Sequence, residues 1–430
     1  MNVCFQYNFH PVGQGLFASG SLYEANAPQP RFVWVYDCGC LPTQPPIDWN
    51  AKIFELYRLT RGKRSIDLLT LSHFDDDHIA GVTALLGRFR VETLVLPYVP
   101  LWERLLIPFA KGIGPGDARM EYFLNPITYL RNIGGENLGR IIVVEPGEED
   151  GPFVEPEGLP REPDLGDRPW KLKAKTKHTN AGETSAEDFG NASPQTESLP
   201  SGQPLTVEGL WEYCPYNAKR RDAQTPDFKA LVEGLRDRLM KPVIAGDTSG
   251  DAKRQIDLAG LKKAYDVEYG SNARQRNIIS LFLYAGPVYP TWQEHKLLSP
   301  LEIANWAYPA RYPCYYRVHP HAPGHTQKCS ILYTGDGYLN TVKSFNSLNS
   351  SLGVNRMSKL GVVQVAHHGA RGNWHEGLAG KLDPAFSVFS SDPARGNTYH
   401  PHAEVLRDFW PYSPIQVNQE GASYCGWLLR

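Results

Sequence analysis

A dense cluster of histidines and aspartates directly follows a short apolar run, Leu68 to Leu71. Its members are His73, Asp75, Asp76, Asp77 and His78. An apolar run that stops at charged residues is typical of a buried strand that ends in a loop, and sites in α/β folds are built at such strand ends. Imidazole nitrogens and carboxylate oxygens are ligands of Zn²⁺ and Mn²⁺, and adjacent carboxylates repel one another unless a cation neutralises them. We therefore interpret the cluster as a metal site; the alternative is a solvated acidic loop with two incidental histidines.

Six further short motifs occur in order between residues 12 and 405. They are VGQG at 12–15, DCG at 37–39, NIIS at 277–280, TGD at 334–336, HHGA at 367–370 and NTYHPHAEV at 397–405. Together with H-x-D-x-D-H at 73–78, they resemble the motifs of the metallo-β-lactamase superfamily, whose metal motif is usually H-x-H-x-D-H. The form with Asp at the third position is similar to the metallo-β-lactamase-like domain of the ComEC DNA-uptake proteins. Ala370 departs from the serine of that family, and the glycine of its closing motif is absent.

This resemblance implies a site for two divalent metal ions, Mn²⁺ or Zn²⁺, with Mg²⁺ as a further possibility. It assigns His73 and Asp75 to the first ion, Asp77, His78 and His367 to the second, and Asp336 to a bridging position, with His368 in the outer shell. The remaining ligand of the first ion falls at Asn277, and His325 in the sequence PGHT is the alternative. Because Asp75 and Asn277 supply oxygen where the superfamily often has nitrogen, we expect Mn²⁺ or Mg²⁺ to be preferred over Zn²⁺.

The resemblance also implies a nuclease that acts on DNA. The metals would acidify a water for in-line attack on phosphorus, with Asp77 or Asp336 orienting it. His402, or alternatively His368, would protonate the leaving oxygen, and His400 would contact a phosphate. The alternative for His400 and His402 is a capped helix start with surface histidines. Ser280 completes the predicted substrate contacts near the metals.

The segment 308–328 is basic and aromatic. It contains Arg311, Arg317, Lys328, four tyrosines and three histidines, and no acidic residue. Aromatic rings among basic groups suit stacking on unpaired bases and holding phosphates, so we expect Arg311 and Arg317 to contact nucleic acid. A packing loop rich in Pro and Tyr is an equal alternative.

Two other classes of function stay open. A hydrolase of small lactones or thioesters predicts a closed apolar pocket and no salt-sensitive binding of DNA, since one fold hosts many chemistries. A non-catalytic interaction protein with a structural metal predicts bound metal and no turnover.

The composition indicates one globular domain over residues 1–430. The apolar fraction is 41% and the formal net charge is −2, so no global basic field attracts nucleic acid. The seven cysteines include no C-x-x-C pair, which argues against a disulfide framework. The start of the chain has no signal-peptide pattern and no apolar run approaches 18 residues, so we expect a cytoplasmic protein without a membrane span.

The periodicity predicts two β-rich layers with helices outside, an αββα sandwich within the α/β (α+β) class, which the resemblance also implies. Apolar strands at 278–284 and 331–334 should pair, and helices are expected at 227–239 and 251–265. Residues 145–204 lack sustained periodicity and begin with a strongly acidic stretch, so we expect a flexible insertion. We hypothesise that the insertion covers a phosphate-binding cleft and that a partner protease cuts it at 179–204; the alternative is a passive loop.

Overall fold

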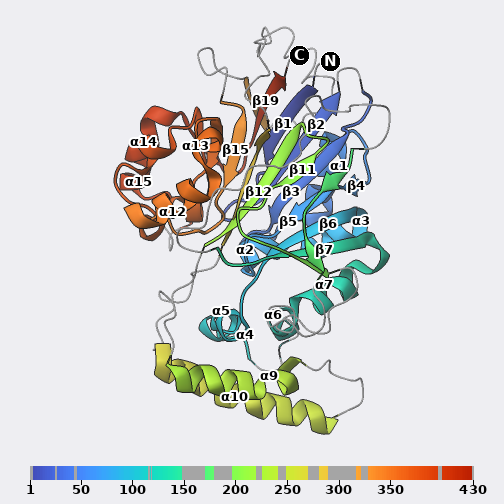
Figure 1. Cartoon of the computed structure of the whole chain (residues 1–430), viewed down its shortest axis with the longest axis vertical. Helices are drawn as coiled ribbons and strands as arrows, with labels where there is room; N and C mark the ends of the chain where they lie inside the picture. The colour runs from blue at the N-terminus through green and yellow to red at the C-terminus, as the bar shows by residue number, and fades with distance from the viewer. Residues whose placement is uncertain are drawn as a thin grey trace.

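A computed structural model gives the fold of the chain. The structure describes residues 3–24, 27–42, 46–114, 117, 119–147, 170–178, 196–218, 225–240, 248–269, 280–288, 316–320, 328–395 and 400–428. Within these residues the fold is mixed α/β. Two large sheets pack face to face, and helices lie on their outer sides (Figure 1).

The first sheet has eleven strands in the order β14-β19-β1-β2-β3-β5-β6-β7-β10-β9, with β4 beside β6. The neighbours β1, β2 and β3 are antiparallel, whereas β3, β5, β6 and β7 are parallel. The bounds are β1 (Val3–Phe9), β2 (Phe17–Glu24), β3 (Phe32–Cys38), β4 (Ser65–Ile66), β5 (Leu68–Thr70), β6 (Arg90–Pro97), β7 (Leu138–Val144), β9 (Lys177–His178), β10 (Thr196–Leu199), β14 (Tyr316–Pro320) and β19 (Gly421–Leu428).

The second sheet has eight strands in the order β18-β17-β16-β15-β13-β12-β11-β8. The predicted pairing of the strands near 278–284 and 331–334 is confirmed, because β13 and β15 are antiparallel neighbours. The strands from β15 to β18 are parallel. The bounds are β8 (Leu172–Lys173), β11 (Leu205–Val207), β12 (Trp211–Asn217), β13 (Leu281–Pro287), β15 (Ser330–Tyr333), β16 (Leu360–Gln364), β17 (Phe386–Ser390) and β18 (Pro414–Val417).

Strand alternation explains why the chain forms layers. Successive side chains of a strand point to opposite faces. In β3, Trp34 and Tyr36 face the second sheet, while Val33 and Val35 pack against the helices. Tyr36 stacks on Tyr333 of β15 with ring centroids 4.7 Å apart, which joins the two sheets through their shared core. Strands that are apolar on both faces are buried between a helical layer and a partner sheet.

Helices cover both outer faces. Against the first sheet lie α1 (Trp49–Leu59), α3 (Val82–Arg88) and α7 (Pro126–Gly134), and the same hydrophobic cluster continues beyond the sheet into α4 (Leu101–Arg104), α5 (Leu106–Ala110), α6 (Met120–Leu124), α9 (Pro226–Met240) and α10 (Thr248–Tyr269). Against the second sheet lie α12 (Val342–Leu352), α13 (Val354–Met357), α14 (Leu378–Leu382) and α15 (Ala403–Phe409). The short turns η1 (Gly135–Asn137) and η5 (Trp410–Tyr412) follow α7 and α15. The helices of the described residues include none long and apolar enough to cross a bilayer.

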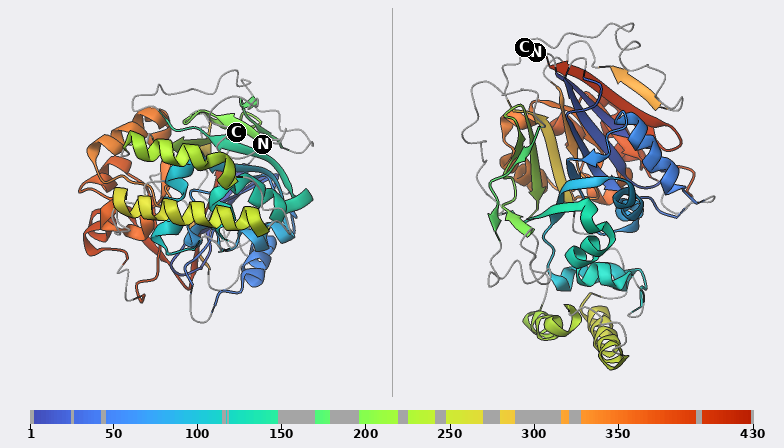
Figure 2. Two further views of the ribbon diagram at one scale, coloured as in Figure 1. Left: turned by 90° about the horizontal axis from the view of Figure 1, so that it is seen from below. Right: turned by 90° about the vertical axis from the view of Figure 1, so that its right-hand side faces the viewer.

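Five of these helices, α4, α5, α6, α9 and α10, form a cap beyond one end of the sheets (Figure 1). Figure 2 shows α9 and α10 side by side across the base of the cap. The buried residue Tyr265 of α10 contacts several other helices of the cap. The Tyr265 ring meets Phe109 edge-on at 5.0 Å and Phe228 at 4.7 Å, and its hydroxyl donates to the Trp102 carbonyl. These contacts hold α5, α9 and α10 together as one layer.

The predicted absence of regular structure at 145–204 is wrong in part. Strands β8, β9 and β10 lie within this range, and β10 pairs in parallel with β7 through Thr196 opposite Ile141. The sheet edge supplied by β7 organises a polar segment that has no strong strand pattern of its own. The acidic residues from 148 to 167 and most of the proposed cleavage segment lie outside the described residues, so the hypothesis of a protease-sensitive cover stays a prediction.

Candidate metal centre

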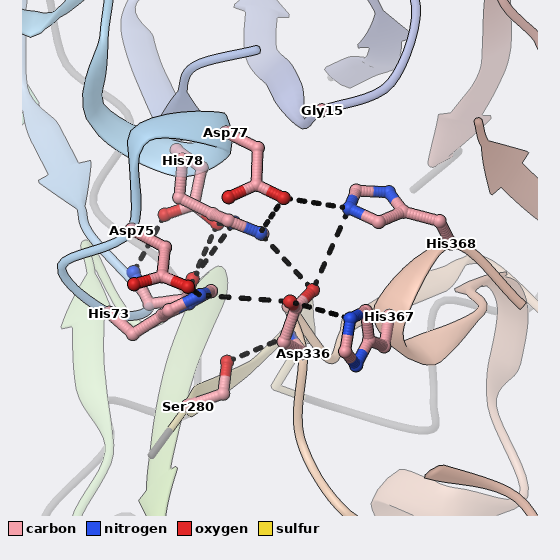
Figure 3. A network of polar contacts seen from close by, with 12 residues as sticks. Gly15, His73, Asp75, Asp77, His78, Ser280, Asp336, His367 and His368 are labelled. Carbon is pink, nitrogen blue, oxygen red and sulfur yellow. Dashed lines mark hydrogen bonds and ion pairs between the residues drawn. The ribbon is translucent and has the colours of Figure 1, made fainter. Parts of the chain in front are cut away.

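The predicted metal ligands gather at the end of the sheets that faces the helical cap. The H-x-D-x-D-H segment leaves β5 and turns into α2 (Asp76–Ile79), Asp336 follows β15, and the His pair follows β16 in the turn η3 (Ala366–Gly369). Figure 3 shows that the side chains from these three segments converge on Asp336. Residues far apart in the sequence therefore meet because β5 of the first sheet and β15 and β16 of the second end at the same edge of the two packed sheets.

Two glycines hold α2 in place under this cluster. A Cβ on Gly15 would lie 2.4 Å from the Cα of Cys40 and 3.0 Å from the Asp77 carbonyl oxygen of α2, and a Cβ on Gly39 would lie 2.3 Å from the amide nitrogen of His78. Neither position accepts a side chain, so these loops can approach α2 only as glycine. The amide of Leu16 also donates to the Asp77 carbonyl at 2.9 Å. The motifs VGQG and DCG thus position the metal motif.

One set of donors comprises four buried residues. One ligand atom from each of Asp77, His78, Asp336 and His368 lies within 4.8 Å of all the others. His78 Nε2 is 3.1 Å from Asp336 Oδ1, and His368 Nε2 is 3.3 Å from Asp77 Oδ2. Ligand atoms at about 2.0–2.2 Å from one ion lie about 3–4 Å from each other, so the spacing suits a tetrahedral site. We call these residues the first donor set.

A second donor set comprises His73, Asp75 and Asp77, again within 4.8 Å of one another. His73 Nε2 is 4.0 Å from Asp75 Oδ2 and 3.7 Å from Asp336 Oδ2. The two oxygens of Asp336 therefore face different sets, since Oδ1 lies beside His78 and Oδ2 beside His73. This is the arrangement that a bridging carboxylate requires.

Unpartnered buried atoms test whether a metal ion fits here. His73 Nε2 is buried and forms no hydrogen bond, and the buried His78 Nε2 and Asp336 Oδ1 have no hydrogen-bond partner beyond each other, at 3.1 Å. The opposite ring nitrogens do have partners, because His73 Nδ1 lies 2.9 Å from Ser72 Oγ and His78 Nδ1 lies 2.7 Å from Asp37 Oδ2. Buried polar atoms without hydrogen bonds are costly, and imidazoles held at one nitrogen with the other free are typical of metal ligands. The cluster could therefore hold a metal ion.

Asp37 is a functional residue to which the sequence analysis assigned no role. It is fully buried, and its backbone adopts a left-handed conformation with φ of 55°. Its carboxylate accepts hydrogen bonds from the Ser72 amide at 2.7 Å and the Ser72 hydroxyl at 2.6 Å, besides facing His78. Asp37 thus orients the imidazole of His78. The only signal in the sequence was the motif DCG.

The electrostatics of the cluster favour charged carboxylates. Burial raises the pKa of Asp77 and Asp336, but neighbouring imidazoles outweigh it and hold both pKa values below the ordinary range. Burial, followed by the neighbouring His78, lowers the pKa of His73 and favours its neutral form. Ionised carboxylates and a neutral His73 are ready to bind metal, whereas the same carboxylates raise the pKa values of His78 and His368, so a metal ion would have to displace protons from these two imidazoles.

The predicted place of His368 outside the ligands is corrected, whereas the ligand role of His367 stays a prediction. We expected His367 to be the ligand and His368 to lie outside, but His368 belongs to the first donor set. Both residues have positive φ, 48° and 58°, in a tight turn that sends their side chains in different directions. His368 Nδ1 donates to the Ser390 carbonyl at 2.6 Å, which leaves its Nε2 facing the cluster. His367 Nε2 lies 3.5 Å from Asp336 Oδ2, on the other side of that carboxylate.

Ser280 was predicted to contact substrate, and the structure gives it a different contact. Its side chain is buried and its hydroxyl accepts a hydrogen bond from the Asp336 amide at 3.0 Å. Asn373, which the sequence analysis missed, donates to the Asp336 carbonyl at 2.7 Å and faces His367 Nδ1 at 2.9 Å. Gln364 accepts from the Gly335 amide at 2.8 Å. Ser280 and Asn373 therefore hold the backbone of Asp336, and Gln364 holds that of the preceding residue, Gly335.

His400 lies nearer the cluster than His402 does. The His400 ring is 5.6 Å from that of His367 and 6.3 Å from that of His368. The His402 ring lies beside His400 at 5.2 Å, and its Nδ1 accepts a hydrogen bond from the Arg371 amide. Both histidines precede α15, as predicted, and His400 is the one that borders the donor sets.

Three predicted residues lie outside the described residues, namely Asn277, Arg311 and the alternative ligand His325. Arg317 lies on β14, opposite Ala422 of β19, at an edge of the first sheet. The last ligand of the ion at His73 and Asp75, which is the ion of the second donor set, and the substrate contacts of segment 308–328 therefore stay predictions.

The comparisons with known proteins leave the site to be judged on its geometry. A scan of the sequence against protein-family models finds no match, and a search of curated proteins finds no significant relative. What stands independently of any relative is a buried group of histidines and aspartates with the spacing of a metal centre.

The geometry predicts unequal effects for the two adjacent histidines. His368→Ala removes a member of the four-residue set and should weaken binding of the tightest metal ion by more than about 100-fold, since even an outer partner is worth about 10–100-fold. His367→Ala should weaken it by about tenfold or less. Titration of each metal-free variant with Mn²⁺ measures these two losses of affinity. Equal losses, or a larger loss for His367→Ala, would contradict the corrected assignment.

Proposed function

We propose that this protein is a metal-dependent phosphodiester hydrolase, a nuclease on DNA, built on a metallo-β-lactamase type of αββα sandwich. The observation that carries the proposal is the pair of buried donor sets that share Asp77 and are spanned by the two oxygens of Asp336. Two metals held by one bridging carboxylate are a common solution for phosphodiester cleavage. The order of the seven motifs and the helix–sheet–sheet–helix layering support the choice of fold.

Different residues of the site would have different roles in hydrolysis. Divalent ions, when bound, supply Lewis acidity and lower the pKa of water. Asp77 and Asp336, kept ionised by their imidazole neighbours, would orient the attacking water toward phosphorus. His402 would donate a proton to the leaving oxygen from the rim of the site. Asp37 and Ser72 would keep the ligand imidazoles fixed during turnover.

His400 would act as a neutral hydrogen-bond donor. Burial, helped by neighbouring histidines, lowers the pKa of His400 to about 4, so the ring is neutral near pH 7. The Gln14 side-chain oxygen accepts from the Asp392 amide at 3.0 Å, which leaves the Gln14 nitrogen to donate to His400 Nδ1 at 3.3 Å. The proton of His400 then resides on Nε2, from which it can be donated to a phosphoryl oxygen.

The oxygen-rich second set guides the choice of metal. Asp75 stands where the superfamily has an imidazole, and oxygen donors favour Mn²⁺ over Zn²⁺. After a chelator has removed bound metal, we expect added Mn²⁺ to restore a higher rate of phosphodiester hydrolysis than added Zn²⁺. Full recovery with Zn²⁺ alone, with no response to Mn²⁺, would overturn this preference.

A substrate panel tests the proposed function. Chelated protein is incubated with plasmid, single-stranded DNA and RNA, with Mn²⁺, Mg²⁺ or Zn²⁺ added separately. Metal-dependent cleavage of DNA is expected, and Asp77→Ala should remove it while circular dichroism stays unchanged. Cleavage that survives in Asp77→Ala would disprove the assignment. Bound metal without any cleavage would favour a non-catalytic role, and turnover of a lactone or thioester alone would favour a small-molecule hydrolase.

A further inference from the structure

Lys111 brings a positive charge to the second donor set. Its Nζ lies 3.4 Å from Asp75 Oδ1 and 3.6 Å from Asp76 Oδ2. The other oxygen of Asp75 is the one that faces His73, at 4.0 Å. The ammonium therefore touches a carboxylate that the second metal ion would need, from the side away from His73.

The helical cap fixes the position of this lysine. Lys111 ends α5, where its amide donates to the Ile107 carbonyl at 3.1 Å. The α5 residue Phe109 packs on Tyr265 of α10, so α5 is anchored within the cap. The Lys111 side chain is about one-third exposed and crosses from the cap to α2. The contact of Lys111 with Asp75 therefore depends on the position of the cap relative to the sheets.

The first donor set has no comparable contact with a lysine among the described residues. The ion pairs of Asp77 and Asp336 with other described residues are all with histidines of the cluster, and none is with a lysine or an arginine. Because Asp336 Oδ2 faces the second set, each set has four possible donors, and the contact of Lys111 with Asp75 is what distinguishes them. A cation at Asp75 both occupies a ligand and repels an incoming divalent ion, and such repulsion is strong between partly buried charges.

We propose that Lys111 is a built-in competitor for the second metal ion, so that the chain binds one ion tightly at the first donor set and a second ion only when Lys111 withdraws from Asp75. This inference rests on the proposed metal centre. It links the position of the helical cap to the metal content of the site, because the cap carries the lysine.

Metal stoichiometry tests the inference without relying on activity. Chelated wild-type protein, Lys111→Met and Lys111→Arg are dialysed against a Mn²⁺ series, and bound metal is counted by elemental analysis. Wild type should bind one ion tightly and a second at least about tenfold more weakly. Lys111→Met keeps the length of the side chain but removes its charge, so it should tighten the second ion by about tenfold or more. Lys111→Arg keeps the charge and should behave as wild type.

The control is Lys262→Met, which removes a lysine paired with Asp266 on the same cap. It should leave both affinities unchanged, and retained binding of the first ion shows that each variant is folded. Electron paramagnetic resonance adds a second readout, because a spin-coupled Mn²⁺ pair should appear at lower metal concentration in Lys111→Met. Equal second-ion affinity in wild type and Lys111→Met, with the first ion still bound, would overturn the role of Lys111 alone. Absence of bound metal in every variant would overturn the metal centre itself.

Discussion

Replacing Asp336 by Asn is expected to abolish metal-dependent hydrolysis. One carboxylate oxygen faces His78 and the other faces His73, so a single substitution weakens both donor sets. Loss of an outer-shell partner typically costs about 10–100-fold, so loss of the shared carboxylate should lower the rate by about 10³-fold or more. The backbone contact with Ser280 is retained, and the fold should therefore survive. Initial rates with saturating Mn²⁺, measured beside circular dichroism, provide the test.

A matched variant separates the site from a general effect of charge. Asp257→Asn removes a carboxylate that pairs with Arg238 between α9 and α10 on the cap. It should keep the wild-type rate and metal affinity. A variant Asp336→Asn that retains more than about a tenth of the wild-type rate would show that this carboxylate does not serve both sets.

Replacing Arg356 by Met is expected to cause the largest loss of stability. Arg356 of α13 is buried, and it forms two hydrogen bonds with the buried Glu212 of β12, at 2.9 and 2.8 Å. Removing one partner of a buried ion pair leaves an uncompensated charge and typically costs about 3–5 kcal/mol. Urea denaturation followed by circular dichroism should show the free energy of unfolding reduced by about this amount.

The double variant provides the internal check. Adding Glu212→Gln to Arg356→Met removes the orphaned charge and should recover part of the lost stability, because replacing both partners is often far less costly than breaking the pair. If the double variant is less stable than Arg356→Met by the full cost of another single substitution, the two residues act independently and the ion pair does not hold α13 to β12.

The local part of the site could be predicted from the sequence. His73, Asp75, Asp77 and His78 lie on one strand-to-helix junction, so their proximity needs no knowledge of the tertiary fold. The strands β1, β3 and β13 carry apolar residues dense enough to identify them. Asp336 could be predicted as a ligand because a short strand precedes it, although its contact with both donor sets depends on how β5 of the first sheet and β15 of the second end close together.

Other features depend on geometry that the sequence does not display. The order of His367 and His368 is decided by two consecutive left-handed backbone conformations. Ser280 supports Asp336 rather than substrate because of where β13 begins beside β15. Lys111 is remote from the metal motif in sequence, and only the packing of the cap brings it to Asp75. The strands β8 to β10 form in a polar stretch because neighbouring strands offer them hydrogen bonds.

Anomalous X-ray diffraction from crystals grown with Mn²⁺ tests the central claim most directly, namely that the buried histidines and aspartates form a metal centre. A strong anomalous peak is expected between Asp77, His78, Asp336 and His368, with a weaker peak or none between His73 and Asp75. An ordered cluster without a peak at saturating Mn²⁺, or a peak only elsewhere on the molecule, would contradict it.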